Sequence, residues 1–220
     1  MGVTLRARGF GSVFLLALVL ILVVSSLGCA AAHLPTPTPR GLVIGLAEAE
    51  EKGLVEADIL GRDLDWIDLV LQSLTPDPLQ VTIPLGTLFE AQALGTQNMV
   101  VIEESMVFLE MEGSSEPLTL RVACADMELH IPDEEDQFII SRSTVPDDVL
   151  KLLNLPEFHE AGGFVQQFAI WTITDNPPRD GYRGLGYFGV GYPPDEDDIE
   201  AIRALFKQAG IPTANYQALR

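Results

Sequence analysis

The sequence has 220 residues, 47% of them hydrophobic, which is enough for one domain with a hydrophobic core. It carries 13 Lys and Arg against 32 Asp and Glu, a formal net charge of −19. Phosphate backbones and anionic lipid surfaces are bound by clustered Lys and Arg. This composition therefore argues against nucleic acid as a partner and against charge-driven binding to anionic membranes.

The N-terminal segment has the pattern of a bacterial export signal. Arg6 and Arg8 precede an unbroken apolar run over residues 13–24, and small residues follow that run. A Gly directly before Cys29 is what lipoprotein processing requires. We therefore predict a lipoprotein signal over residues 1–28, with the lipid carried by Cys29.

Two alternatives to lipidation stay open for this segment. Ser26 stands where lipoprotein signals usually have Leu, which leaves room for plain cleavage. An uncleaved anchor is the other alternative, because residues 13–34 approach the length that spans a bilayer. Each alternative places residues 41–220 on the extracytoplasmic face. Residues 29–40 are rich in Pro and Thr and predict a semi-rigid tether off the cell membrane.

The region after the tether begins with a short helix and continues as strands. Residues 46–52 favour a helix that ends at Gly53. From about residue 59 to 130, short runs of apolar and β-branched residues alternate with turns that contain Pro and Gly. The expected strands are 66–71, 79–84, 88–89, 99–102, 106–111 and 118–124. This spacing predicts an antiparallel, immunoglobulin-like β-sandwich.

The character of the sequence changes after Pro132, and helices are expected from about residue 145 to 220. Residues 147–153 have the pattern of a short capped helix. Residues 164–174 are apolar on nearly every side, as in a buried helix. A last helix begins at the acids after Pro194 and stops at Gly210. Residues 41–220 are thus expected to be a single, mainly β domain with helical additions (α+β).

One pair of residues suggests chemistry. Cys124 ends a strongly patterned strand, and Gln167 opens the segment Gln-Phe-Ala-Ile-Trp. This segment resembles the Gln-x-Ala-Ile-Trp signature of bacterial surface thioester domains over roughly residues 119–175. The resemblance implies a bond between the Cys124 thiol and the Gln167 side chain, electrophilic toward amines, which Trp171 could shield from water. The competing interpretation makes Cys124 a small buried hydrophobe and Gln167 a core amide that is hydrogen-bonded to a strand.

Two further groups of residues are weaker candidates for binding sites. Four aromatic residues follow the buried helix and could stack on a ligand, although packing on the core is the commoner fate: Tyr182, Tyr187, Phe188 and Tyr192. A run of acids offers oxygen ligands that calcium prefers, but it does not match a spaced calcium loop: Asp133, Glu135 and Asp136. No other metal or cofactor is expected.

The function expected from the sequence is that of an exported, membrane-anchored binding module without enzymatic activity, whose partner is a protein or a glycan. Covalent adhesion through a Cys124–Gln167 thioester is the first alternative. A hydrolase of the cell envelope, with carboxylates that meet only in three dimensions, is the second.

Overall fold

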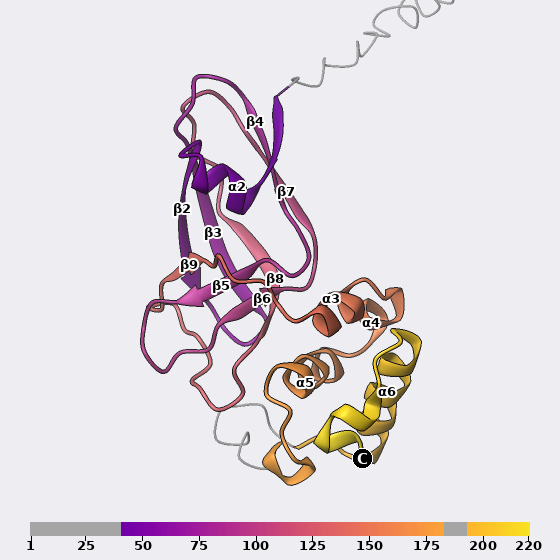
Figure 1. Cartoon of the computed structure of the whole chain (residues 1–220). Helices are drawn as coiled ribbons and strands as arrows, with labels where there is room; N and C mark the ends of the chain where they lie inside the picture. The colour runs from indigo at the N-terminus through magenta and orange to yellow at the C-terminus, as the bar shows by residue number, and fades with distance from the viewer. Residues whose placement is uncertain (1–40, 183–192) are drawn as a thin grey trace, which may run out of the picture. The chain divides into compact units, whose positions relative to one another are not determined.

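The computed structural model of the chain describes residues 41–182 and 193–220, and its strands lie in two sheets (Figure 1). The expected signal, Cys29 and the tether lie outside the described residues. Within the described ranges, no helix combines the length and the apolar character needed to cross a bilayer.

The smaller sheet has three strands in the order β1-β4-β7. They are β1 (Leu42–Gly45), β4 (Leu79–Ile83) and β7 (Ser105–Leu109). Strand β1 runs parallel to β4, whereas β4 and β7 are antiparallel. The helix α2 (Leu46–Glu51) follows β1 directly. Ile44, Val81 and Val107 stand in one row across the three strands, and their side chains are buried in the core.

The larger sheet has six strands in the order β2-β3-β8-β6-β5-β9, and each neighbouring pair is antiparallel. The strands are β2 (Val55–Gly61), β3 (Trp66–Ser73), β5 (Leu88–Ala91), β6 (Met99–Val101), β8 (Leu118–Cys124) and β9 (Phe138–Ile140).

The two edges of the larger sheet approach each other, so that the sheet is close to a barrel. Leu60 of β2 forms a bridge with Gln137, and the Gly61 N–H donates to the Asp136 carbonyl oxygen at 2.8 Å. A Cβ at Gly61 would collide with the carbonyl oxygen of Asp133. Glycine at this position therefore allows the close approach of the two edges.

Four helices follow the strands: α3 (Asp147–Leu153), α4 (Pro156–Glu160), α5 (Gly163–Thr174) and α6 (Glu196–Gln208). Figure 1 shows them grouped together at one side of the strands. Eight consecutive residues of α5, from Gln166 to Ile173, are buried, and this helix packs against β8, α3 and α6. Helix α6 begins with a capping box between Asp195 and Asp198. Two short 3-10 helices, η2 (Thr213–Asn215) and η3 (Gln217–Leu219), end the chain.

The predicted mainly β fold with helical additions is confirmed as a mixed α+β arrangement, but the immunoglobulin-like sandwich is not confirmed. A parallel pair of strands and a nearly closed six-stranded sheet are not features of that sandwich. The strands also extend beyond the expected range of 59–130, because β1 and β9 lie outside it. The four expected helices occur near their predicted bounds, and α4 is an additional one.

Candidate functional site

The side chain of Gln167 is hydrogen-bonded to the main chain of Cys124 in both directions. The Cys124 N–H donates to Oε1 of Gln167 at 2.9 Å, and Nε2 of Gln167 donates to the Cys124 carbonyl oxygen at 2.8 Å. Both residues are buried. Helix α5 is thus joined to the end of β8 by a side-chain amide that forms the two bonds of a neighbouring strand.

The local topology explains why these main-chain groups need a partner. Strand β3 pairs with residues 118–121 of β8 and then diverges, while β6 stays paired with residues 122–124 on the other side. Cys124 would therefore present an unpaired N–H and C=O to the core, which is costly in the absence of water. The carboxamide of Gln167 has one donor and one acceptor at the spacing of a peptide group, so it satisfies both.

The Cys124 thiol lies in an apolar and electronegative environment. Its Sγ is 3.4 Å from Sδ of Met99 and 3.7 Å from the Leu64 carbonyl oxygen. Burial raises the pKa of this thiol well above its ordinary value, and the nearby carboxylates of Asp65 and Asp126 raise it further. The thiol of Cys124 is accordingly protonated at neutral pH, which is the less nucleophilic form.

Trp171, the residue expected to shield a thioester, lies fully in the core. Its Nε1 donates to Oε1 of Gln97 at 3.2 Å, and Nε2 of Gln97 donates to the Leu129 carbonyl oxygen at 3.0 Å. Gln97 is 1% exposed and joins α5 to the loop before β6. The role of Gln97 is not evident from the sequence, since an isolated Gln between Thr96 and Asn98 carries no pattern of its own.

Of the aromatic residues that follow α5, the structure describes Tyr182. It is fully buried, its hydroxyl lies 2.6 Å from the Thr172 hydroxyl, and its ring packs edge-on against Phe168. Tyr182 therefore belongs to the core and is not a surface group for stacking on a ligand, which corrects its assignment as a ligand-binding candidate. Tyr187, Phe188 and Tyr192 lie outside the described residues.

The acids considered for calcium are used to close a turn. Oδ1 of Asp133 accepts the Glu135 N–H, and Oδ2 of Asp136 accepts the Asp133 N–H. Oδ1 of Asp136 also accepts the Thr96 hydroxyl at 3.0 Å. Among residues 41–182 and 193–220, no group of three or more His, Cys, Asp or Glu side chains is arranged to hold a metal ion. Calcium binding here stays a prediction.

The lining of a cavity of about 840 Å³ includes three acidic residues, Asp126, Glu128 and Asp175. The pKa of Asp175 is raised above its ordinary value, chiefly by burial. Hydrogen bonds from the Thr174 hydroxyl and the Met127 N–H act in the opposite direction, and the nearby carboxylates of Asp126 and Glu128 raise the pKa further. Asp126 in turn accepts the N–H of Asn98 at 2.9 Å. These bonds give both aspartates a role in holding loops, so the cavity supports a hydrolase only weakly.

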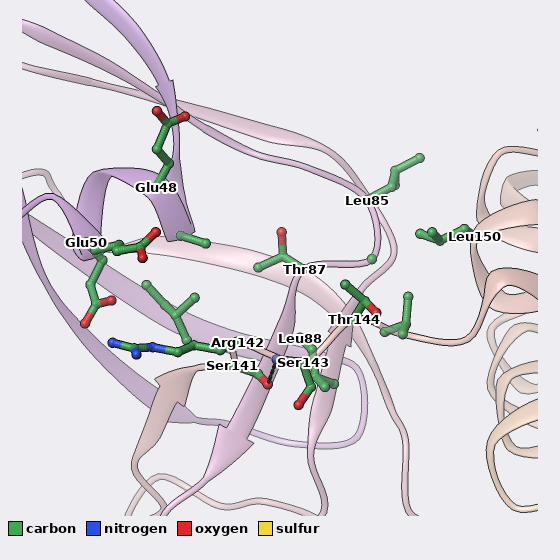
Figure 2. Close-up of a pocket in the computed structure, with 15 residues that line it drawn as sticks. Glu48, Glu50, Leu85, Thr87, Leu88, Ser141, Arg142, Ser143, Thr144 and Leu150 are labelled. Carbon is green, nitrogen blue, oxygen red and sulfur yellow. Dashed lines mark hydrogen bonds between the residues drawn. The ribbon is translucent and has the colours of Figure 1, made fainter.

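A different pocket, of about 560 Å³, lies where α2, the turn between β4 and β5, and the segment after β9 meet (Figure 2). Its apolar lining includes Leu85, Leu88 and Val145. The polar lining comes from hydroxyl and charged side chains: Glu48, Glu50, Glu51, Thr87, Ser141, Arg142, Ser143 and Thr144. This pocket is not evident from the sequence, because its walls come from segments about 40 to 100 residues apart.

Arg142 is the distinctive residue of this pocket. Figure 2 shows its side chain extending toward the part of α2 that carries Glu50. In the described part of the chain, most Lys and Arg side chains pair with a carboxylate, and none of these ion pairs involves Arg142. Opposite charges therefore line one pocket without meeting. A pocket with charged groups on one side and Leu85 and Leu150 on the other suits a small ligand that has both a polar and an apolar part (Figure 2).

Comparison with protein-family models, with curated proteins and with solved structures gives no significant match to this chain.

Proposed function

We propose that this protein is an exported, membrane-anchored binding module without enzymatic activity, and that its ligand occupies the pocket beside Arg142. The single observation that carries this proposal is the pocket itself, with its apolar lining, its hydroxyl groups and its unpaired Arg142. The signal-like segment and the Pro/Thr-rich tether of the sequence support the extracytoplasmic location.

The size and the chemistry of the pocket limit the ligand. A volume of about 560 Å³ lies within the range of roughly 300–1,000 Å³ that is usual for small-ligand sites. A short peptide segment or one to two sugar units of a glycan would fit this space. Arg142 and the hydroxyls of Ser143 and Thr144 would bind its polar groups, and the Leu and Val side chains would cover its apolar part.

Filling the pocket tests this proposal. Thr144 is exposed at the wall, so Thr144→Trp occupies the space without removing a core contact. We expect peptides and envelope glycan fragments that bind the full chain in calorimetry to lose at least tenfold in affinity with this variant. Glu157→Trp on the exposed side of α4 is the matched control. Ligands that bind Thr144→Trp as well as the original chain would show that the pocket is not the site.

The anchoring is tested separately. We expect the full chain to sediment with membranes and to carry a lipid on Cys29, whereas Cys29→Ala is released from the membrane fraction. A Cys29→Ala variant that stays bound to membranes while retaining residues 1–28 would support the uncleaved anchor. Release of both forms would contradict anchoring.

A thioester is the second candidate, because the Gln167 carboxamide is hydrogen-bonded to the main chain of Cys124, the residue that carries the thiol. In this reaction the sulfur of Cys124 bonds to the amide carbon of Gln167, and the thiol proton leaves with the amide nitrogen as ammonia. An intact mass lower by one ammonia, restored by methylamine and absent in Cys124→Ala, would establish this bond. An unmodified mass would exclude it.

A further inference from the structure

Exposed apolar side chains gather around the point where the tether joins the domain. Among the described residues, nine large hydrophobic side chains are exposed, and six of them belong to the three-stranded sheet and its adjoining turns. We call five of these six the apolar surface: Val43, Leu74, Met106, Phe108 and Met111. Leu42 is left out because it stands in register with the buried Leu79 and so points to the other side of the sheet. Single exposed hydrophobic residues are normal, but a gathering on one region indicates an interaction.

The register shows that part of this surface is one continuous face. Val43, Gln80 and Phe108 stand in one row across β1, β4 and β7, and Thr82 and Met106 stand in the next row. Residues in register point to the same side of a sheet. Val107 and Leu109, which alternate with the exposed residues in β7, point to the core.

The turns at the end of this sheet extend the same surface. Leu42 and Leu109 both stand in register with Leu79, so the start of β1 and the end of β7 flank the start of β4 at one end of the sheet. Beyond β7, the Glu112 N–H donates to the Thr75 carbonyl oxygen at 3.3 Å. This bond holds the turn that carries Met111 next to the turn that carries Leu74.

The tether joins the domain at the same place. Gly41 precedes β1 and packs so closely on the Pro78 carbonyl oxygen that a Cβ there would lie 2.6 Å from it. The residues between Cys29 and Gly41 can extend about 35 Å at about 3.1 Å each. A domain held on so short a tether meets its membrane at an effective concentration in the millimolar range, so even a weak contact is populated.

We propose that the apolar surface lies against the lipid bilayer to which the chain is anchored. This inference depends on the anchoring proposed above. Exposed Asp77, Glu110 and Glu112 border this surface. Their charge opposes anionic headgroups and leaves zwitterionic lipid as the favoured contact. The contact orients the domain through β1, β4 and β7.

An environment-sensitive fluorophore tests the contact. The full chain is labelled at Met111→Cys and placed in phosphatidylcholine vesicles. Cys124 is buried, and the thiol of Cys29 is blocked by the lipid in the proposed anchoring, so the label goes to position 111. Leu94→Cys, fully exposed in the loop between β5 and β6 of the larger sheet, is the matched control. We expect quenching by spin-labelled lipid to be at least threefold stronger at position 111 than at 94, and to weaken when phosphatidylglycerol is added at low salt.

The other outcomes are distinct. Val43→Ser combined with Phe108→Ser must reduce the quenching at position 111, because both residues belong to the proposed contact. If the fluorophore at position 111 is shielded from water to a degree that rises with the protein-to-lipid ratio, a second copy of the chain covers the surface. That result would overturn the proposal. If the chain floats with the vesicles in a density gradient but its fluorophore shows the same water-like emission at positions 111 and 94, this contact alone is overturned. A chain that does not float overturns the anchoring as well.

Discussion

The carboxamide of Gln167 takes the place of a β-strand beside Cys124, with hydrogen bonds of 2.9 and 2.8 Å to the two main-chain groups. This side chain thereby helps to fix the helical part of the domain to the end of β8. The same pair of residues is the one that the thioester resemblance singled out. The structural role of the intact amide is observed, and the covalent bond is a proposal.

Replacing Gln167 with Ala is expected to destabilise the fold strongly, because it leaves the Cys124 N–H and C=O buried and unpaired. The expected loss in the free energy of unfolding is about 2–5 kcal/mol. Urea unfolding measures it. Cys124→Ala, which keeps both hydrogen bonds, is the control and is expected to cost about 1 kcal/mol. Equal losses in the two variants would show that the amide bonds contribute little.

The Cys124 thiol should make the fold less stable at alkaline pH. Burial raises its pKa above the ordinary 9.0, so the folded chain keeps a proton that the unfolded chain loses. This contribution is fully present below about pH 9 and is lost as the pH rises above it. We expect the free energy of unfolding to fall more steeply above that pH in the original chain than in Cys124→Ala. Parallel curves for the two proteins would be the contrary result.

Tyr182 is expected to titrate late. Burial raises its pKa from 10.0 to about 12, although the hydrogen bond with Thr172 acts in the opposite direction. The stability that this shift contributes is present below about pH 10 and is lost as the pH approaches 12. Tyrosinate absorbance of the original chain and of Tyr182→Phe, compared in native and unfolded samples, identifies the group. Tyr216, whose pKa is also raised by burial and by its hydrogen bond to Asp148, stays late in both native proteins. A Tyr182→Phe variant that loses a tyrosine from the normal titration range, with the number of late tyrosines unchanged, would contradict the assignment.

A methyl group at Gly86 should be poorly tolerated at the wall of the pocket. Gly86 has φ +77, and a Cβ there would lie 2.5 Å from Cδ2 of Leu150 and 3.2 Å from Cγ2 of Val145. Gly95, with φ +95 and no neighbouring atom within 4 Å, is the matched control. Both changes to Ala carry backbone strain, and Gly86→Ala is expected to cost about 1 kcal/mol more, from the steric clash. Thermal unfolding that ranks Gly95→Ala as the more damaging change would contradict this account.

Most individual elements could be predicted from the sequence. The alternating run at 79–84 became β4, and the all-round apolar pattern at 164–174 became the buried helix α5. The acids after Pro194 were expected to begin a helix, and Asp195 does cap α6. These signals are local, since they arise from side-chain periodicity and from hydrogen bonds over three or four residues.

The sequence by itself thus determined the acidic, mainly β character of the domain, all of its α-helices except α4, and Cys124 and Gln167 as a notable pair. Only the tertiary structure decided that β1 runs parallel to β4, that β2 closes toward β9, and that Arg142 lines a pocket with α2. It also decided that Tyr182 belongs to the core. The reason is physical: periodicity records which face of an element is buried, whereas the partner of that face depends on contacts between segments far apart in the chain.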